Sequence, residues 1–206
     1  MDDAIERAEQ WDKVYENAAP EDLPWYSSRV DADLAEALEK YNLRTGTFLD
    51  IGTGPGTMAI AAAERGFQVT AFDISPHAIE MAVARAGQLA SKIDFRVDDI
   101  LQTQLPHDHF DVLHDRGCFH SLSPKDWSRY VAAVRSLIKD DGYLLLKTFS
   151  WHVPGDLGPY RFRPEELRRV FTPQFEFVEL RDSLFQGETE TRQALFAVLR
   201  PRMPRQ

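Results

Sequence analysis

The sequence has one cysteine, Cys118, among its 206 residues. An internal disulfide is therefore excluded, and such sparing use of cysteine favours a reducing compartment. The chain also lacks any apolar stretch near the roughly 20 residues that a membrane-spanning helix needs. Residues 1–6 are acidic and have neither the basic beginning nor the apolar run of a signal peptide. These absences predict a cytoplasmic protein without a membrane partner.

Basic residues are also scarce. The chain carries 24 Lys and Arg against 33 Asp and Glu, a formal net charge of -9. Nucleic-acid binding draws much of its affinity from neutralised phosphates, so this balance counts against DNA and RNA as partners. The basic residues near the C-terminus are interleaved with prolines, which is typical of a solvated tail. We expect a small-molecule substrate as the partner, and a monomer or weak homodimer.

Apolar residues, by contrast, are plentiful enough for one core. They make up 43% of the chain, with 13 Phe and 4 Trp, which is ordinary for a globular protein. A chain of this length supports a single domain, here residues 1–206. No internal repeat or low-complexity segment divides it.

The apolar pattern alternates between strands and helices. Runs typical of strands occupy residues 47–51, 68–73, 93–97, 110–115 and 143–149. Helical spacing marks residues 31–40, 57–65, a segment that starts at Ser75, 123–138 and 164–171. Two further strand-like runs, 175–180 and 194–199, have only a turn around Gly187 between them, which excludes a helical crossover. The sequence therefore predicts a doubly wound α/β sheet of seven strands, five of parallel type followed by an antiparallel hairpin.

A glycine-dense turn follows the first strand run. Gly52, Gly54 and Gly56 form G-x-G-x-G, whereas the dinucleotide fingerprint places its third glycine one position later. Asp50, where the strand meets the turn, would repel a pyrophosphate but suits a ligand with an ammonium group. Asp73 ends the neighbouring strand, where a carboxylate can accept hydrogen bonds from both hydroxyls of a ribose. This combination favours an adenosine-bearing ligand without phosphates.

S-Adenosylmethionine has these features: an amino-acid ammonium, a ribose diol and no phosphate. Asp98, Asp99 and Ile100 end the third strand run, where an acid can accept from the adenine amine and Ile100 can pack on the ring. An NAD-dependent oxidoreductase is disfavoured by Asp50 and by the early third glycine, and a helix-capping turn with solvated acids is the plainer alternative. The candidate cofactor-binding residues are Asp50, Gly52, Thr53, Gly54, Gly56, Thr57, Asp73, Ile74, Asp98, Asp99, Ile100 and Asp115.

The N-terminal segment, residues 1–30, is rich in aromatic side chains, among them Trp11, Tyr15 and Trp25. Aromatic faces stabilise a cation such as a sulfonium once water is excluded. We therefore expect this segment to form a lid that contacts the cofactor. The alternative is that these aromatics staple the first helix to the sheet. The rest of the chain divides into a cofactor-binding core, 47–150, and a substrate-side loop, short helix and hairpin, 151–199.

Three motifs carry a resemblance to a known family. They are LDIGTGPG at 49–56, FDIS at 72–75 and FDVLHDRG at 110–117. From about Trp11 to Leu199 the chain resembles class I S-adenosylmethionine-dependent methyltransferases, and within them the thiopurine methyltransferase and tellurite-resistance-like group. Thr53 departs from the family pattern, in which many members carry cysteine.

The resemblance implies that the loop after the fourth strand lies next to the transferred methyl group. Arg116 would face the substrate and could stabilise an anionic nucleophile such as a thiolate, and His120 could take a proton. The competing interpretations are an ion pair between Arg116 and Asp115 or another strand-end acid, and a packing role for His120. The other residues expected to line the substrate pocket are Trp25, Trp151, His152, Tyr160 and Arg161.

No metal is expected in this site. The nearby histidines include His109 and His114, which alternation along the strand places on different faces. The sequence therefore predicts methyl transfer from S-adenosylmethionine to a small-molecule acceptor, most simply a soft nucleophile such as a thiol, selenium or tellurium species. The alternatives are O- or N-methylation of a small metabolite, an RNA or protein methyltransferase, and a non-catalytic protein that binds S-adenosylmethionine.

Overall fold

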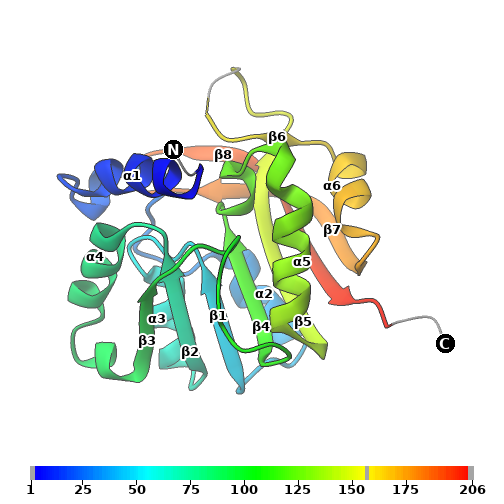
Figure 1. Ribbon diagram of the computed structural model, residues 1–206, viewed down its shortest axis with the longest axis horizontal. Helices are drawn as coiled ribbons and strands as arrows, with labels where there is room; N and C mark the ends of the chain where they lie inside the picture. The colour runs from blue at the N-terminus through cyan, green and yellow to red at the C-terminus, as the bar shows by residue number, and fades with distance from the viewer. Residues whose placement is uncertain (1–2, 156–157, 204–206) are drawn as a thin grey trace.

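The computed structural model of the chain describes residues 3–155 and 158–203 (Figure 1). Its strands are β1 (Thr47–Ile51), β2 (Gln68–Asp73), β3 (Ile93–Val97), β4 (Phe110–Arg116), β5 (Ile138–Ser150), β6 (Arg161–Phe162), β7 (Phe175–Gln186) and β8 (Thr191–Pro201). They form one sheet in the order β3-β2-β1-β4-β5-β8-β7, with β6 paired to β5 beside this path. The pairs from β3 to β5 are parallel, and β8 is antiparallel to both β5 and β7. The expected doubly wound sheet with a C-terminal antiparallel hairpin is confirmed.

The C-terminal hairpin is longer than the sequence predicted. β7 and β8 have 12 and 11 residues and continue well beyond the apolar runs 175–180 and 194–199. The extra part of β7 alternates exposed side chains with half-buried or buried ones, so it carries no continuous apolar run. Near the turn of this hairpin, the N–H of Glu188 donates to the carbonyl of Tyr26 at 2.8 Å. The hairpin therefore reaches the N-terminal segment.

Two other details of the sheet differ from the sequence prediction. β5 begins at Ile138, before the turn expected at residues 140–142. β6 is a strand of two residues, too short to be predicted from an apolar run. The pairing of β4 with β5 shifts register between Phe110 and Val112. Gly142 lies at this shift, where an added Cβ would be 3.0 Å from the carbonyl oxygen of Asp111. The absence of a side chain there lets β5 continue through the irregularity.

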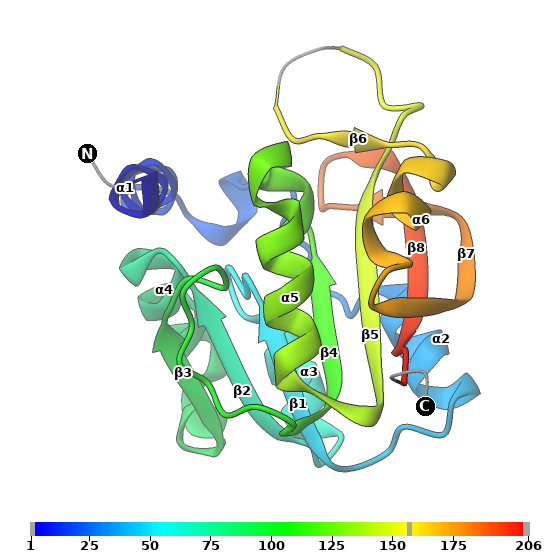
Figure 2. The same ribbon diagram turned by 45° about the vertical axis from the view of Figure 1, so that its right-hand side comes forward.

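Helices cover both faces of the sheet. On one face are α2 (Ala32–Lys40), α3 (Thr57–Glu64) and α4 (Pro76–Ala86), and their apolar residues pack with Phe48 and Val112. On the other are α5 (Trp127–Leu137) and α6 (Pro164–Phe171), which pack with Leu49 and Leu113 and stand in front of the sheet in Figure 2. The helix expected over 123–138 is a 3-10 turn, Pro124–Asp126, followed by α5. The other 3-10 turns are Pro20–Asp22, Gly87–Lys92 and Phe119–Ser121.

The start of the chain folds as a helix, α1 (Asp3–Tyr15), which lies beyond the carboxyl ends of β2 and β3 and beside α4 (Figures 1 and 2). Asp12 of α1 accepts hydrogen bonds from the Ser75 hydroxyl at 2.7 Å and from the His77 backbone N–H at 3.1 Å. Ser75 also caps α4 as the sequence predicted, because its Oγ accepts from the N–H of Ala78 at 3.1 Å. The cap of α4 is therefore also an anchor for α1.

Across residues 3–155 and 158–203, every helix falls short of the length and apolar character needed to cross a membrane.

Candidate active site

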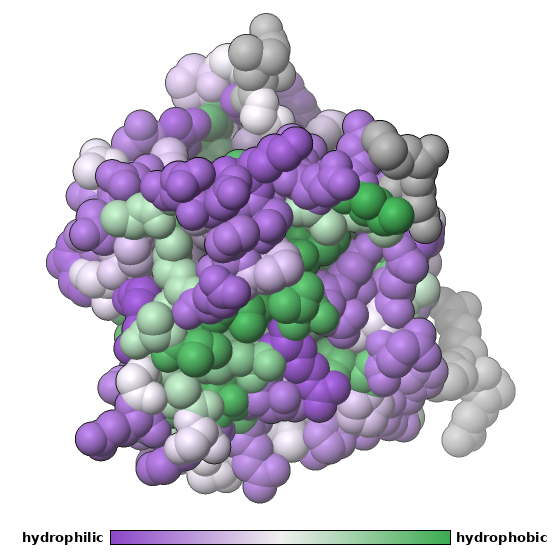
Figure 3. All heavy atoms as spheres, turned by 60° about the vertical axis from the view of Figure 1, so that its left-hand side comes forward, coloured by the Kyte–Doolittle hydropathy of each residue, from purple (hydrophilic) through white to green (hydrophobic). Residues whose placement is uncertain are grey.

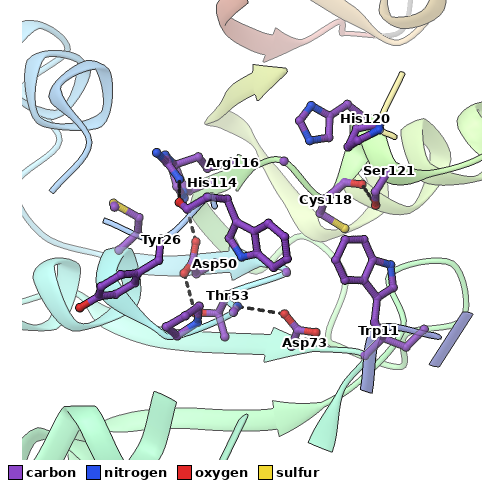
Figure 4. Close-up of a pocket in the computed structure, with 18 of the residues that line it drawn as sticks. Trp11, Tyr26, Asp50, Thr53, Asp73, His114, Arg116, Cys118, His120 and Ser121 are labelled. Carbon is purple, nitrogen blue, oxygen red and sulfur yellow. Dashed lines mark hydrogen bonds and ion pairs between the residues drawn. The ribbon is translucent and has the colours of Figure 1, made fainter. Parts of the chain in front are cut away.

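A cavity of about 350 Å³ opens at the carboxyl ends of the strands. It lies where the strand order reverses, because β1 is flanked by β2 on one side and by β4 on the other. Its volume falls in the range of small-molecule sites, about 300 to 1000 Å³. Figure 4 shows Asp50, Asp73, Arg116 and Trp11 around it, contributed by three strand ends and α1. This position and size make the cavity the candidate active site.

Most residues expected to contact the cofactor line this cavity. They are Trp11, Tyr15, Trp25, Asp50, Gly52, Thr53, Gly54, Thr57, Asp73, Ile74, Asp98, Asp99 and Ile100. Gly56 and Asp115 do not line it. The structure therefore brings all but two of the candidate cofactor residues to one cavity.

The glycine turn brings the backbone to the edge of the cavity. Gly52 has φ 66° and Gly54 has φ 50°, left-handed conformations that favour glycine. A Cβ on Gly52 would lie 2.8 Å from Cβ of Cys118, and one on Gly54 would lie 3.0 Å from the Tyr15 hydroxyl. Gly56 has a different purpose, since its Cβ would lie 2.9 Å from Cβ of Ala82 in α4. Gly56 thus allows close packing of α4, and its expected contact with the cofactor stays a prediction.

Asp50 is buried and held by two polar neighbours. One carboxylate oxygen lies 2.7 Å from His114 Nδ1, and the other accepts a hydrogen bond from the Thr53 hydroxyl at 2.7 Å (Figure 4). The carboxylate is thereby fixed at the start of the glycine turn, on the lining of the cavity. It places negative charge where the sequence predicted a partner for an ammonium group.

Asp73 ends β2 on the same side of the cavity. Its two oxygens accept hydrogen bonds from the backbone N–H groups of Gly54, at 2.9 Å, and Ser75, at 3.1 Å. Burial raises the pKa of Asp73 from 3.8 to about 6, although these N–H groups favour the ionised form. A carboxylate in this position still has lone pairs for further donors such as hydroxyls.

The end of β3 meets α1 at the cavity. Asp98 accepts from the Thr103 hydroxyl at 2.5 Å, and Asp99 forms an ion pair of 2.6 Å with Arg7 of α1. Arg7 also lines the cavity, and its Nε is buried without a hydrogen-bond partner among the described residues. Sequence reasoning missed Arg7. The signal was its spacing, because residues 7, 11 and 15 recur on one face of a helix.

The aromatic residues of the N-terminal segment form one cluster. The ring centroid of Trp25 lies 5.8 Å from that of Trp11 and 6.1 Å from that of Tyr15, in edge-to-face arrangements. All three line the cavity, while Tyr15 also packs against Ala78 of α4. Burial raises the pKa of Tyr15 well above its ordinary value, so its hydroxyl stays neutral. The cluster therefore covers the cavity and also anchors the segment to α4.

Arg116 lines the cavity with its guanidinium already engaged. Its Nε pairs with Asp31 at 2.9 Å, and its terminal nitrogens donate to the carbonyls of Trp25 at 2.9 Å and Gln186 at 2.5 Å. The guanidinium also lies 4.0 Å from the ring centroid of Phe185. Arg116 therefore forms an ion pair, as the competing interpretation predicted, but its partner is Asp31 and not Asp115. Arg116 joins the N-terminal segment to the hairpin and brings a positive charge to the cavity.

A buried charge network lies behind Arg116, and no pattern in the sequence indicated it. Lys147 of β5 contacts both oxygens of Asp31 at 2.6 Å and Asp33 at 2.5 Å. Burial alone would raise the pKa of Asp31, but Lys147 and Arg116 hold it below its ordinary value. Asp31 also caps α2 by accepting from the N–H groups of Asp33 and Leu34. One carboxylate therefore positions α2, Lys147 and Arg116.

His120 lines the cavity as a neutral side chain. Its Nδ1 accepts a hydrogen bond from the backbone N–H of Phe149 at 2.9 Å. Burial, together with the charges of Arg116 and Arg161, lowers the pKa of His120 to about 3. The proton-accepting role expected for His120 is therefore corrected. Its Nδ1 is occupied, and protonation would place a third positive charge in a buried site.

Asp115 is fully buried and accepts hydrogen bonds from the turn that follows β4. The donors are the N–H groups of Gly117, Cys118 and Phe119 and the hydroxyl of Tyr130, the last at 2.6 Å. Asp115 does not line the cavity and both of its oxygens are engaged by these donors, so the expected cofactor contact finds no support in the geometry and stays a prediction. Asp115 instead shapes the turn that carries Gly117 and His120.

The loop after β5 contributes less to the cavity than expected. Trp151, His152, Tyr160 and Arg161 do not line it. Trp151 is 43% exposed, and its ring centroid lies 4.0 Å from the guanidinium carbon of Arg163 and 4.0 Å from the ring centroid of His152. Tyr160 donates to Glu166 at 3.2 Å, and Arg161 donates to the carbonyl of Pro159. Each of the four contacts the loop or α6 instead, so their substrate role stays a prediction that the lining of the cavity does not support.

The hairpin supplies cavity residues in place of that loop. Phe149 of β5 and Phe185 of β7 line the cavity, together with Glu190 and Arg192 at the start of β8. Arg192 pairs with Glu190 at 2.6 Å and lies 5.8 Å from the ring centroid of Phe149. Sequence reasoning missed these residues because it ended the hairpin strands too early. With Trp25 they make one end of the cavity aromatic, and Arg192 and Glu190 add an ion pair there.

Within residues 3–155 and 158–203, no group of three or more His, Cys, Asp or Glu side chains is arranged to hold a metal ion.

A doubly wound sheet with a cavity at its switch point and carboxylates at successive strand ends defines an enzyme of the adenosine-cofactor class. A family model described as a methyltransferase domain matches residues 25–177. The chain therefore belongs to the methyltransferase domain family, which confirms the expected class of enzyme, S-adenosylmethionine-dependent methyltransferases.

Three relatives illustrate this membership. An uncharacterized methyltransferase of Schizosaccharomyces pombe is 32% identical over 102 residues, which span 50% of this chain and 70% of the relative. EEF1A lysine methyltransferase 2 of Danio rerio is 28% identical over 162 residues, 74% of this chain and 70% of that protein. Thiocyanate methyltransferase 1 of Arabidopsis thaliana is 27% identical over 167 residues, 79% of this chain and 71% of that protein.

Solved structures share the fold. A protein studied in the conversion of a disulfide bond into a thioacetal group during echinomycin biosynthesis has a TM-score of 0.80 at 24% identity, covering 95% of this chain and 93% of that one. The 1,6-didemethyltoxoflavin-N1-methyltransferase of Burkholderia thailandensis, solved with S-adenosylhomocysteine, gives 0.69 at 20%, covering 97% and 85%. A TehB-like methyltransferase of Corynebacterium glutamicum gives 0.67 at 17%, covering 95% and 98%.

Proposed function

We propose that this enzyme transfers the methyl group of S-adenosylmethionine to a small soft nucleophile, a thiol or a selenium or tellurium species. The observation that carries the proposal is the division of one cavity into two chemical halves. One half has carboxylates at three strand ends, and the other has aromatic rings with Arg116 and Arg192. The first half suits a cationic nucleoside, and the second suits an electron-rich acceptor.

The carboxylate half fits the cofactor by the chemistry of its donors and acceptors. Asp50 would face the ammonium, Asp73 would accept from the ribose hydroxyls, and Asp98 or Asp99 would accept from the adenine amine, with Ile100 against the ring. The backbone at Gly52 and Gly54 lies close enough to the cavity that a side chain on either would meet a neighbour. The aromatic cluster of the lid segment, residues 1–30, would face the sulfonium.

When bound, the cofactor supplies a methyl group already activated by a positively charged sulfur. The chain then has to align the acceptor and exclude water, which can be worth several kcal/mol. Trp11 and Trp25 cover the cavity, and Arg116 ties Trp25 to the hairpin through the carbonyls of Trp25 and Gln186. These two hydrogen bonds connect the N-terminal segment to the hairpin at the edge of the cavity.

The acceptor half supports a soft nucleophile over an amine. Trp25, Phe149 and Phe185 offer polarisable apolar walls, and Arg116 lies 4.0 Å from the ring centroid of Phe185. Two arginines favour an anion such as a thiolate and oppose an ammonium. One relative is named for thiocyanate and another neighbour is TehB-like, which agrees with the thiopurine and tellurite subgroup that the sequence resembles. A lysine methyltransferase is also among the relatives, but a lysine acceptor would approach these arginines as a cation.

The test is an acceptor panel. Wild-type enzyme is incubated with S-adenosylmethionine and, separately, with an aryl thiol, selenite, tellurite, a catechol, a primary amine and a lysine peptide, and S-adenosylhomocysteine is quantified. The proposal predicts turnover with the sulfur, selenium or tellurium acceptors that exceeds turnover with the oxygen and nitrogen acceptors. Preferential methylation of the catechol, amine or peptide would contradict it.

A further inference from the structure

His120 offers the cavity one ring nitrogen. Its Nδ1 is occupied by the backbone N–H of Phe149, and its ring packs against the rings of Phe149 and Phe185 with centroids at 4.5 and 5.9 Å. The residue is 5% exposed and lines the cavity (Figure 4). A neutral imidazole whose Nδ1 accepts a hydrogen bond carries its proton on Nε2. The free nitrogen is therefore a hydrogen-bond donor.

Gly117 keeps this donor uncovered. Its φ is 105°, and a Cβ added there would lie 3.1 Å from His120 Nε2 and 3.2 Å from Cζ of Phe185. Any side chain at position 117 would crowd the nitrogen. The turn that holds Gly117 is itself fixed by the N–H groups that Asp115 accepts. The Asp115 carboxylate fixes the turn, and the missing side chain at Gly117 leaves space beside His120 Nε2–H.

The charged groups around His120 oppose its protonation. Arg116 at the end of β4 and Arg161 of β6 act on it directly. Arg192 of β8 lies over the ring of Phe149, and Glu190 is paired with Arg192. Cys118 also lines the cavity, and burial raises the pKa of its thiol well above the ordinary value. This end of the cavity therefore provides donors and positive charge.

We propose that the acceptor enters as an anion and that His120 Nε2–H donates a hydrogen bond to its nucleophilic atom. Among small acceptors, the enzyme would then select those that are already ionised at neutral pH and can lie against the rings of Phe149 and Phe185. This inference rests on the proposed methyl transfer and narrows its substrate class. It replaces the general-base role that the sequence suggested for His120 with a role in specificity.

The transfer balances without a proton acceptor. A lone pair of the acceptor anion forms the new bond to the methyl carbon while the bond between that carbon and the sulfonium sulfur breaks, and its electron pair stays on that sulfur. The negative charge of the acceptor and the positive charge of the sulfonium are both cancelled. Because the nucleophilic atom loses charge on the way, a hydrogen bond to it favours the bound anion over the transition state. His120 should therefore affect KM more than kcat.

Two substitutions separate the roles of the two ring nitrogens. His120→Asn keeps an acceptor near the position of Nδ1 for the Phe149 N–H but removes the donor at Nε2, whereas His120→Gln places an amide donor near Nε2. For an ionised aryl thiol we expect KM to rise roughly tenfold in His120→Asn while kcat stays the same or increases, and we expect KM to be largely restored in His120→Gln. Equal KM values in both variants and wild type would overturn the proposal.

A pH series provides the second arm. Aryl thiols of matched size, with thiol pKa values on both sides of neutrality, are compared by kcat/KM. We expect kcat/KM to rise with pH, to pass its inflection at the thiol pKa of that acceptor, and to level off above it. An inflection that stays fixed across the series and disappears in His120→Asn, or in a variant of His114, would reveal an enzyme base and overturn the inference. If S-adenosylhomocysteine binds but no thiol is methylated, the proposed function fails instead.

Discussion

Arg7 of α1 and Asp99 after β3 form an ion pair, with 2.6 Å between the guanidinium nitrogen and the carboxylate oxygen. Arg7, Trp11 and Tyr15 share one face of α1, and all three line the cavity. The pair joins the lid segment to the strand end proposed to hold adenine. Closure of the lid segment and binding of the cofactor are therefore expected to depend on each other.

Arg7→Met tests this dependence. It keeps the apolar stem of the side chain but removes the charge-assisted hydrogen bond to Asp99, so we expect the Kd of S-adenosylmethionine to rise roughly tenfold. Isothermal titration calorimetry measures the change. Lys125→Met is the matched control. It removes an exposed ion pair that also ends on α1, the pair between Lys125 and Asp3. Cofactor affinity that falls equally in both variants would count against a specific role for Arg7.

Asp73 is expected to make cofactor binding depend on pH. Its ionised carboxylate accepts ribose hydroxyls better than its protonated form does, and its pKa is raised by burial to about 6. Affinity for S-adenosylhomocysteine should therefore increase as the pH rises through 6 and then level off. Asp73→Asn should bind more weakly and show a flatter profile. A profile of unchanged steepness in Asp73→Asn would assign the dependence to another group.

The same shift has a consequence for the free enzyme. Asp73 binds its proton more tightly in the folded chain than in the unfolded chain, where its pKa is 3.8. Between those two values the folded state holds more protons, so the contribution of Asp73 to stability falls as the pH rises. Urea unfolding should show that the free energy of unfolding of wild type minus that of Asp73→Asn decreases from about pH 4 to pH 6.5. A difference that increases over this range would contradict the raised pKa.

Lys147 is expected to be a large contributor to stability. It is buried with Asp31 and Asp33, so Lys147→Met leaves two buried carboxylates with less compensating charge, at a cost of about 3 to 5 kcal/mol in the free energy of unfolding. Lys40→Met is the control, since Lys40 is half exposed and its solvent-screened pair with Glu179 should contribute little to stability. Urea unfolding of both variants should separate them clearly. Similar losses would mean that burial adds nothing to the network.

Tyr130→Phe should destabilise the turn that follows β4. The Tyr130 hydroxyl donates to the fully buried Asp115 at 2.6 Å, so its removal is expected to cost about 1 to 3 kcal/mol. Tyr160→Phe removes a longer, partly buried bond to Glu166 and should cost about 0.5 kcal/mol or less. If the two substitutions cost the same in urea unfolding, Asp115 is not the organising group of this turn.

The parts of the fold that local chemistry determines could be predicted from the sequence. β1, β2 and β3 match the predicted bounds, because each is a short run ended by a glycine turn or by acids at the strand end. The cap at Ser75 and the position of α6 were predicted for the same reason. The cavity residues at these strand ends followed from topology, since parallel strands bring their carboxyl ends together.

Contacts between distant segments could not be predicted in this way. Whether Arg116 pairs with Asp31 or Asp115 depends on where α2 begins relative to β4, and the two carboxylates look alike in the sequence. The Nδ1 atom of His120 is occupied by the backbone N–H of Phe149, and any residue other than proline at position 149 would supply this donor. The sequence therefore contains no signal for this contact. The hairpin residues Phe185 and Arg192 were missed because their strands extend on polar, half-exposed sequence.

Calorimetric titration of the wild-type enzyme with S-adenosylmethionine and S-adenosylhomocysteine tests the central claim most directly. We predict one site per chain for each ligand, with binding weakened by Asp73→Asn and by Arg7→Met and unaffected by Lys125→Met. The absence of binding by either ligand, at concentrations where the enzyme is folded, would contradict the assignment of this cavity.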